Sequence, residues 1–183
     1  MPIRGLKDNT IKTSIAALNA ALADAVALRM AIKQAHWTVK GPHFIAIHEL
    51  FDEVVDRIAE NADILAEQVQ TLGGQAQGSL EAVAKAAKIK PYPLDLVKDM
   101  DHVRAVCERV ADAGERVRKA IDETADAGDA DTADIFTAYS RQLDKDLWFI
   151  ESHLGEAPKF GLPLSSPATG LARDSGSGRC ESA

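Results

Sequence analysis

The chain has 183 residues, 46% of them hydrophobic, and a formal net charge of −7. This length suits one domain with a substantial core, and no apolar run approaches the roughly eighteen residues that a membrane-spanning helix needs. The acidic net charge is unfavourable for nucleic-acid binding. The N-terminus has no apolar stretch typical of a signal peptide, so we expect a cytoplasmic protein.

The first predicted helix covers residues 10–39 and follows an N-terminal arm, residues 1–9. Its apolar side chains recur three or four residues apart, which is the spacing of an amphipathic helix. His36 continues this stripe near the helix end, so we expect its imidazole on the inner face. The other members of the stripe are Ile11, Ile15, Leu18, Leu22, Ala25 and Ile32.

A short turn leads to the second predicted helix, residues 43–72. Pro42 suits the first turn of this helix and Gly73 suits its end. A long connection follows, and it contains a short predicted helix at residues 79–87 with Ser79 as its N-cap.

Two more long helices are predicted at residues 94–127 and 131–154. Four long helices with one long crossover make an all-α, ferritin-like four-helix bundle, which we assign to residues 10–155. Residues 156–183 are rich in Pro, Gly, Ser and Thr, and we expect a flexible tail. On the third long helix we expect His102 at the surface and Cys107 as a buried thiol.

Two pairs of polar side chains with metal-ligand chemistry lie on one side of the second helix. His48 and Asp52 are four residues apart, as are Asp63 and Glu67, and eleven residues from Asp52 to Asp63 are close to three turns. His48 and Glu67 are nevertheless about 28 Å apart along the axis, too far for one ion. Two antiparallel copies of the helix across a two-fold axis would join the front pair of one to the rear pair of the other. The end of the first helix brings His36 close to this intersubunit site.

A structural explanation of the same residues is open at this point. A lone histidine on an apolar helix face is more often a hydrogen-bonded core residue than a ligand, and helical carboxylates usually form a solvated face. The Glu-x-x-His motifs of a metal site inside one bundle do not occur in this chain, which favours an interface over an intrabundle site.

The chain resembles the Dps family, small ferritin-like proteins whose members oxidise iron. The resemblance rests on HW-x-x-KG-x-x-F-x-x-x-H-E-x-F-D from His36, followed by D-x-x-x-E from Asp63. The segments YPLD, DTADI and LDKDLWFIES at residues 92–95, 131–135 and 143–152 also match, so the similarity covers residues 11–154.

The resemblance implies a ferroxidase centre at a two-fold interface of a hollow twelve-subunit cage. Fe²⁺ would be oxidised to Fe³⁺, preferably by hydrogen peroxide, and stored, which protects the cell from oxidative damage. One subunit would supply His36, His48 and Asp52, and the partner subunit would supply Asp63 and Glu67. Beside the centre, Trp37 matches a tryptophan thought to take part in electron transfer; a packing role at the helix end is the alternative.

Two acidic residues, Asp131 and Asp134, match the family's three-fold pore, through which Fe²⁺ enters. The plain explanation is the N-terminus of the predicted helix, where Asp caps the helix and complements its dipole, and both explanations can hold together. Neither end of the chain has a lysine cluster of the kind with which some family members hold DNA. We therefore expect weak DNA binding at most. A nucleoid protein that mainly compacts DNA, and a shell with a degenerate site, are the alternative functions.

Overall fold

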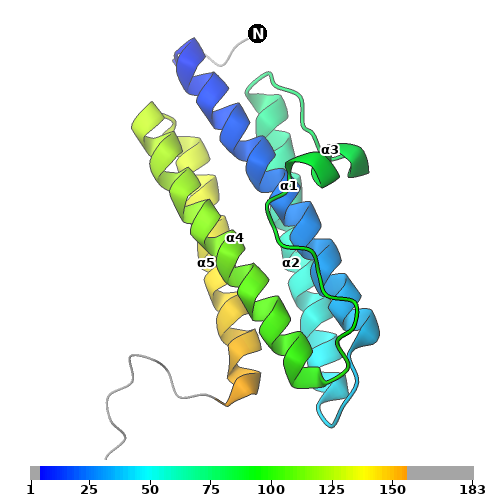
Figure 1. Ribbon diagram of the computed structural model, residues 1–183. Helices are drawn as coiled ribbons and strands as arrows, with labels where there is room; N and C mark the ends of the chain where they lie inside the picture. The colour runs from blue at the N-terminus through cyan, green and yellow to red at the C-terminus, as the bar shows by residue number, and fades with distance from the viewer. Residues whose placement is uncertain (1–4, 156–183) are drawn as a thin grey trace, which may run out of the picture.

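The computed structural model describes residues 5–155 (Figure 1). Five α-helices and one 3-10 helix make up this part of the chain. Their bounds are Asp8–Thr38 for α1, Phe44–Thr71 for α2, Leu80–Ala86 for α3, Asp99–Ala127 for α4, Ala130–Glu151 for α5 and Ser152–Leu154 for η1. The predicted tail, residues 156–183, lies outside the described residues, as do residues 1–4 of the predicted arm.

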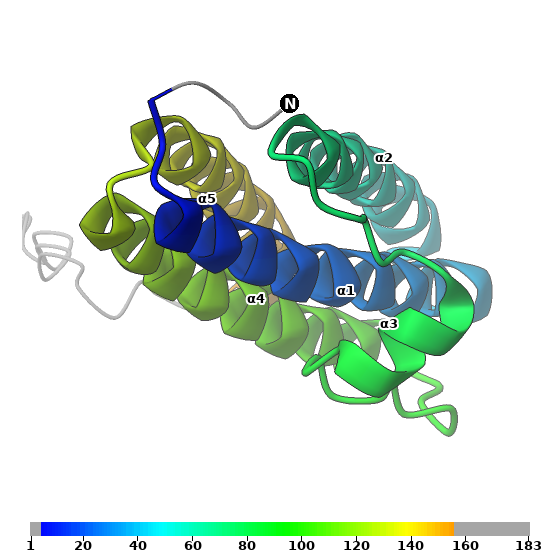
Figure 2. The same cartoon turned by 90° about the horizontal axis from the view of Figure 1, so that it is seen from above.

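Two helical hairpins, α1 with α2 and α4 with α5, form the bundle (Figures 1 and 2). Helix α1 also packs along α4, so α1 and α4 form one side of the bundle and α2 and α5 the other. The crossover from α2 to α4 carries α3 and runs beside α1 (Figure 1). The predicted all-α bundle with a short crossover helix is therefore confirmed.

The core is built from the apolar stripes that the sequence predicts. Each fully buried Leu, Ile or Phe side chain contributes about 1.5–3 kcal/mol of burial free energy, so these residues hold the hairpins together. They include Leu18, Leu28, Ile32, Ile47, Phe51, Ile58, Leu65, Phe136, Leu143 and Ile150. Within residues 5–155, α1 is long and apolar enough to span a membrane by composition, yet it is the buried core helix of the bundle.

The fourth helix begins later than predicted, at Asp99 instead of residue 94. Lys98 has an extended backbone, and Asp99 places a negative charge in the first turn of α4, where it complements the helix dipole. The preceding segment is fixed instead by Arg109, which donates hydrogen bonds to the carbonyl groups of Lys90 and Pro91.

The prediction that His102 lies at the surface is wrong. Its side chain is 1% exposed, because the crossover covers this face of α4, and the hydroxyl of Tyr92 lies 2.6 Å from its Nδ1. Burial lowers the pKa of His102 and raises that of Tyr92 to about 12. Cys107, by contrast, is buried as predicted.

Helix ends follow the predicted local chemistry. Gly73 has a φ of +81° directly after the C-cap of α2, a conformation that favours glycine. The Ser79 hydroxyl accepts a hydrogen bond from the backbone N–H of Ala82 at 3.3 Å and caps α3. Asp129 caps α5 by accepting a hydrogen bond from the backbone N–H of Thr132.

Candidate metal centre

Two histidines meet where α1 ends and α2 begins. His36 lies in the last turn of α1 and is 7% exposed, while His48 projects from the second turn of α2. Their imidazole rings stack, with centroids 3.7 Å apart and planes 20° from parallel. The short turn between the helices therefore brings together two predicted ligands that are twelve residues apart.

Reciprocal hydrogen bonds to the backbone orient the two imidazoles. The Nδ1 of His36 lies 2.8 Å from the carbonyl oxygen of His48, and the Nδ1 of His48 lies 2.9 Å from the carbonyl oxygen of His36. A carbonyl oxygen only accepts, so each Nδ1 carries the proton and donates it. In the neutral ring this leaves the Nε2 lone pair of both histidines available, which is the form of imidazole that binds a metal ion.

The carboxylate of Asp52 lies next to this pair. Its pKa is lowered, chiefly by a hydrogen bond from the Lys33 ammonium group and to a smaller extent by the charges of His36 and His48. The Asp52 side chain is 47% exposed, so it can reach a ligand from outside the subunit. Among residues 5–155, the structure therefore brings His36 and His48 into contact, but His36, His48 and Asp52 do not converge as a group of three that could hold a metal ion.

The other two predicted ligands lie further along the same helix. Asp63 and Glu67 are both exposed on α2, about 16 Å or more beyond Asp52 along the axis. Within residues 5–155 of a single chain, no three metal-ligating side chains converge on one point. The fold therefore does not bring Asp63 and Glu67 to the histidines of the same subunit.

Aromatic side chains flank the histidine pair. Trp37, the next residue after His36, is 59% exposed, so the single bundle gives its indole ring little packing. Phe44 lies against His48, with ring centroids 5.0 Å apart.

The acidic corner between α4 and α5 separates into exposed and buried carboxylates. Asp131 and Asp134, the predicted pore residues, are exposed in the first turns of α5. Asp129 is only 2% exposed and accepts hydrogen bonds from the hydroxyl groups of Ser14 and Thr132, at 2.6 and 2.7 Å. Asp129 is a structural cap, whereas Asp131 and Asp134 are free to meet ions in solvent.

Sequence reasoning missed two contacts that shape this site. Lys33 lies three residues before His36 and so shares its helix face, a spacing that could have indicated its role. The second contact fixes the turn between the histidines, where the Asp99 carboxylate lies 3.2 Å from the His43 backbone nitrogen and 3.0 Å from its Nδ1. A Cβ atom on Gly41 would lie 2.5 Å from the same carboxylate, so this close approach requires glycine.

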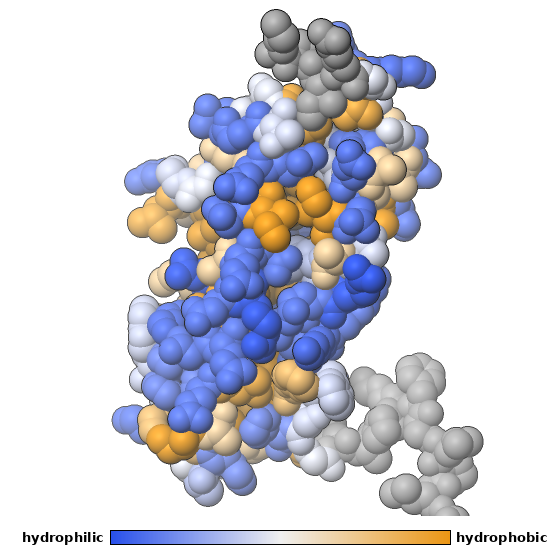
Figure 3. Space-filling view, turned by 180° about the vertical axis from the view of Figure 1, so that it is seen from behind, coloured by the Kyte–Doolittle hydropathy of each residue, from blue (hydrophilic) through white to orange (hydrophobic). Residues whose placement is uncertain are grey.

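The α2–α5 side of the bundle is largely hydrophilic, with apolar groups in its upper half and again near its lower end (Figure 3). Near the N-terminal end of α2, Glu49 and Glu53 line a shallow hollow with Phe149 of α5 and His153 of η1. These exposed carboxylates give this side of α2 an acidic character.

The four-helix bundle with its short crossover helix defines a ferritin-like protein, and residues 15–160 match the ferritin-like domain family. A DNA protection during starvation protein of Agrobacterium fabrum is 49% identical over 151 residues, which cover 82% of this chain and 93% of the relative. Such a protein from Mycolicibacterium smegmatis is 30% identical, with 85% and 84% covered. This chain belongs to the Dps family.

Solved structures of Dps proteins agree with this assignment. A Mycobacterium smegmatis Dps superimposes with a TM-score of 0.82 at 30% identity, covering 86% of this chain and 94% of the other. DpsA14 from Streptomyces coelicolor gives a TM-score of 0.80 at 31% identity, with 85% and 94% covered.

Proposed function

We propose that this Dps protein is a ferroxidase that oxidises Fe²⁺ with hydrogen peroxide at sites shared by two subunits. The observation that carries the proposal is the His36–His48 pair, whose two Nε2 lone pairs are held ready by reciprocal hydrogen bonds. Imidazole with carboxylate is a ligand set suited to redox iron, and here it lies beside the exposed carboxylate of Asp52.

The remaining ligands of each site would come from Asp63 and Glu67 of a two-fold related copy. Their exposure on α2 and their distance from the histidines of their own chain support this arrangement. A two-fold axis gives two equivalent sites for each pair of subunits. Twelve such subunits would form the hollow cage that is usual in this family, with Asp131 and Asp134 lining its Fe²⁺ entrances.

Iron is the substrate of this reaction. Two Fe²⁺ ions lose one electron each, and one hydrogen peroxide molecule takes up both electrons with two protons from solvent to give two water molecules. Because the electrons leave as a pair, no hydroxyl radical is released. The carboxylates bind the ferric product more strongly than Fe²⁺, and Fe³⁺ would collect as oxide on acidic residues such as Glu49 and Glu53.

Lys33 has a distinct part in the proposed site. Its ammonium group pairs with the carboxylate of Asp52, so the carboxylate is not left as an unpaired negative charge. Fe²⁺ must displace this group to bind. Lys33 therefore competes with the substrate and gives the site a lower affinity than its ligands alone would provide.

Peroxide-driven oxidation tests the proposal directly. The protein is loaded with Fe²⁺ without oxygen, stoichiometric hydrogen peroxide is added, and ferric absorbance is followed. The wild-type protein should oxidise Fe²⁺ in a fast phase. A variant with His48→Ala and Asp52→Ala should lose this fast phase while its assembly stays intact. The matched control carries Asp56→Ala and Glu60→Ala, two exposed carboxylates of the same helix, and should keep the wild-type rate.

DNA compaction is the rival function, and the names of the relatives refer to DNA protection. Removal of Fe²⁺ and peroxide protects DNA without contact, which agrees with the net charge of −7. A gel-shift assay at low salt separates the two. Equal oxidation rates in all three proteins, together with a strong gel shift, would favour compaction.

A further inference from the structure

A hollow of about 170 Å³ opens between α1 and α4, and no residue of α2 lines it. The two helices lie side by side in Figure 2. The walls of the hollow are methyl groups, because small residues occupy both helices where larger ones would normally interdigitate. The wall residues are Ala17, Ala20, Ala21, Ala25, Ala113, Val117 and Ala120. This site is separate from the histidine pair at the α1–α2 turn.

Tyr139 of α5 reaches this hollow from the core and is only 2% exposed. Its hydroxyl oxygen is buried and has no hydrogen-bond partner within residues 5–155. Buried hydroxyl groups are normally satisfied, so an unpaired one next to a hollow indicates a missing partner. Burial, with the nearby charges of Asp146 and Asp24, raises the pKa of Tyr139, so its hydroxyl keeps its proton and can donate.

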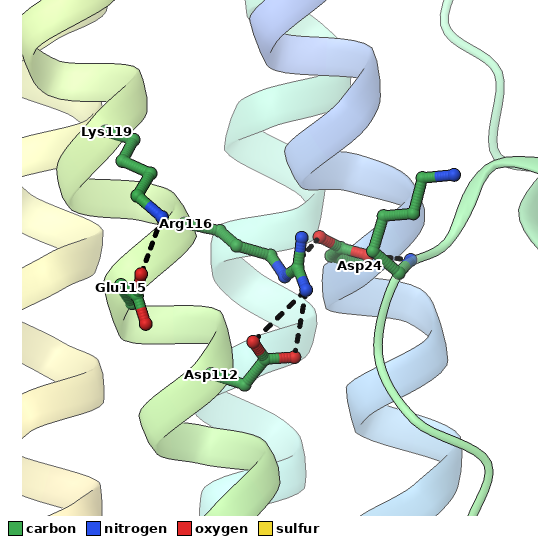
Figure 4. A network of polar contacts seen from close by, with 6 residues as sticks. Asp24, Asp112, Glu115, Arg116 and Lys119 are labelled. Carbon is green, nitrogen blue, oxygen red and sulfur yellow. Dashed lines mark hydrogen bonds and ion pairs between the residues drawn. The ribbon is translucent and has the colours of Figure 1, made fainter.

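Charged side chains surround the opening (Figure 4). Arg116 lies between Asp24, at 3.8 Å, and Asp112, at 3.1 Å, and the Lys119 ammonium group lies 2.5 Å from Glu115. Lys88 and Glu123 also line the hollow and add one charge of each sign. The opening therefore has three cationic groups and four carboxylates, which leaves no net positive charge for an anionic ligand.

A charged ligand of either sign would lose its hydration against the alanine walls without gaining a full partner. A water molecule at Tyr139 would fill only a small part of the hollow, and the alanine walls offer further waters no polar partner. The Nε of Arg116, which lines the same hollow, is also buried without a hydrogen-bond partner in the described residues. An apolar cavity of about 150 Å³ is known to accept one benzene ring, so the space here suits a molecule of that size.

We propose that this hollow binds an uncharged, one-ring molecule whose hydroxyl or carbonyl oxygen accepts a hydrogen bond from Tyr139. Phenol is the simplest member of this class. The alanine side chains of α1 and α4 take up the ring, and the Tyr139 hydroxyl selects molecules with an oxygen over plain hydrocarbons.

Ligand-observed saturation-transfer NMR on the full-length assembled protein tests this site with phenol, benzene, benzoate and benzylamine as probes. Wild type should show saturable phenol binding, weaker binding of benzene, and the weakest binding of the two charged probes. Tyr139→Phe removes the hydrogen-bond donor. It should weaken the affinity for phenol by about 3- to 10-fold and leave the affinity for benzene unchanged.

Filling the hollow provides the second arm of the experiment. Ala21→Leu should abolish binding of phenol and benzene, and Ala16→Leu, at an exposed position of the same helix that does not line the hollow, should leave both unchanged. Ala20→Leu, at an exposed wall position, replaces Ala21→Leu if that variant fails to assemble. The proposal is overturned if phenol does not saturate, if the filled variants still bind it, or if Tyr139→Phe weakens phenol and benzene equally.

Discussion

Replacing Lys33 with methionine should strengthen Fe²⁺ binding. The substitution keeps the length of the side chain and removes the ammonium group that holds Asp52. Both partners are partly exposed, at 27% for Lys33 and 47% for Asp52, so solvent screens their attraction. Ion pairs of this kind contribute about 0.2–1 kcal/mol. Fe²⁺ no longer has to break this contact in the variant, so the dissociation constant should fall by a factor of about 1.4–5.

Anaerobic calorimetric titration of the assembled protein with Fe²⁺ measures this effect. Lys12→Met, at an exposed position near the other end of α1, is the matched control and should leave the affinity unchanged. Added salt should reduce the difference between wild type and Lys33→Met, because it screens the ion pair that only wild type has. Weaker Fe²⁺ binding in Lys33→Met would refute the competition argument and make Lys33 a supporting residue of the site.

The same substitution has a consequence for stability with a definite sign. The pKa of Asp52 is lowered in the folded protein, so its pairing stabilises the fold above the unfolded pKa and this contribution is lost as pH falls through the folded pKa. Lys33→Met should therefore lower the free energy of unfolding by at most about 1 kcal/mol near neutral pH and leave it unchanged in strong acid. Urea unfolding at fixed protein concentration measures the difference.

Further substitutions test the packing that positions the site. Arg57→Met should destabilise the fold by about 3–5 kcal/mol in urea unfolding, because it leaves the fully buried Asp146 without the guanidinium group 2.8 Å away; adding Asp146→Leu should restore most of the loss. Because the pKa of His102 is lowered in the folded protein, the unfolded chain binds a proton that the folded chain excludes, and stability should fall as pH drops below about 6.5. In His102→Gln, the free energy of unfolding should depend less steeply on pH. Gly41→Ala should lower the free energy of unfolding by about 1–3 kcal/mol, because the φ of Gly41 is +149° and a Cβ atom would meet Asp99. An unchanged thermal unfolding temperature would contradict this reasoning.

Most of the helical framework could be predicted because each long helix carries its own signal. The apolar period and the glycine stop of α2 are local, so its bounds differ from the predicted ones by one residue at each end. The start of α4 was wrong because Leu94 and Val97 continue the apolar period of that helix, yet both are exposed in the crossover, at 80% and 68%. Periodicity does not reveal which apolar residues the tertiary fold leaves in solvent.

The candidate site shows the same division between local and non-local information. The spacing of the two carboxylate-bearing pairs on α2 and the position of His36 could be read from the sequence. The ring stacking, the reciprocal hydrogen bonds and the Lys33–Asp52 pair depend on how α1 packs against α2. His102 was misplaced for a similar reason, since the crossover that buries it has no helical period to predict its path.

The central claim is that each oxidation site uses side chains from two subunits, and subunit mixing tests it most directly. One variant carries His48→Ala and Asp52→Ala, and the other carries Asp63→Ala and Glu67→Ala. Each alone should lack the fast peroxide-dependent oxidation of Fe²⁺. After the two are unfolded and refolded together, half of the two-fold pairs are mixed and each mixed pair has one intact site, so about a quarter of the wild-type amplitude should return. No recovery in mixed assemblies that form normally, or full activity in either parent, would contradict the shared site.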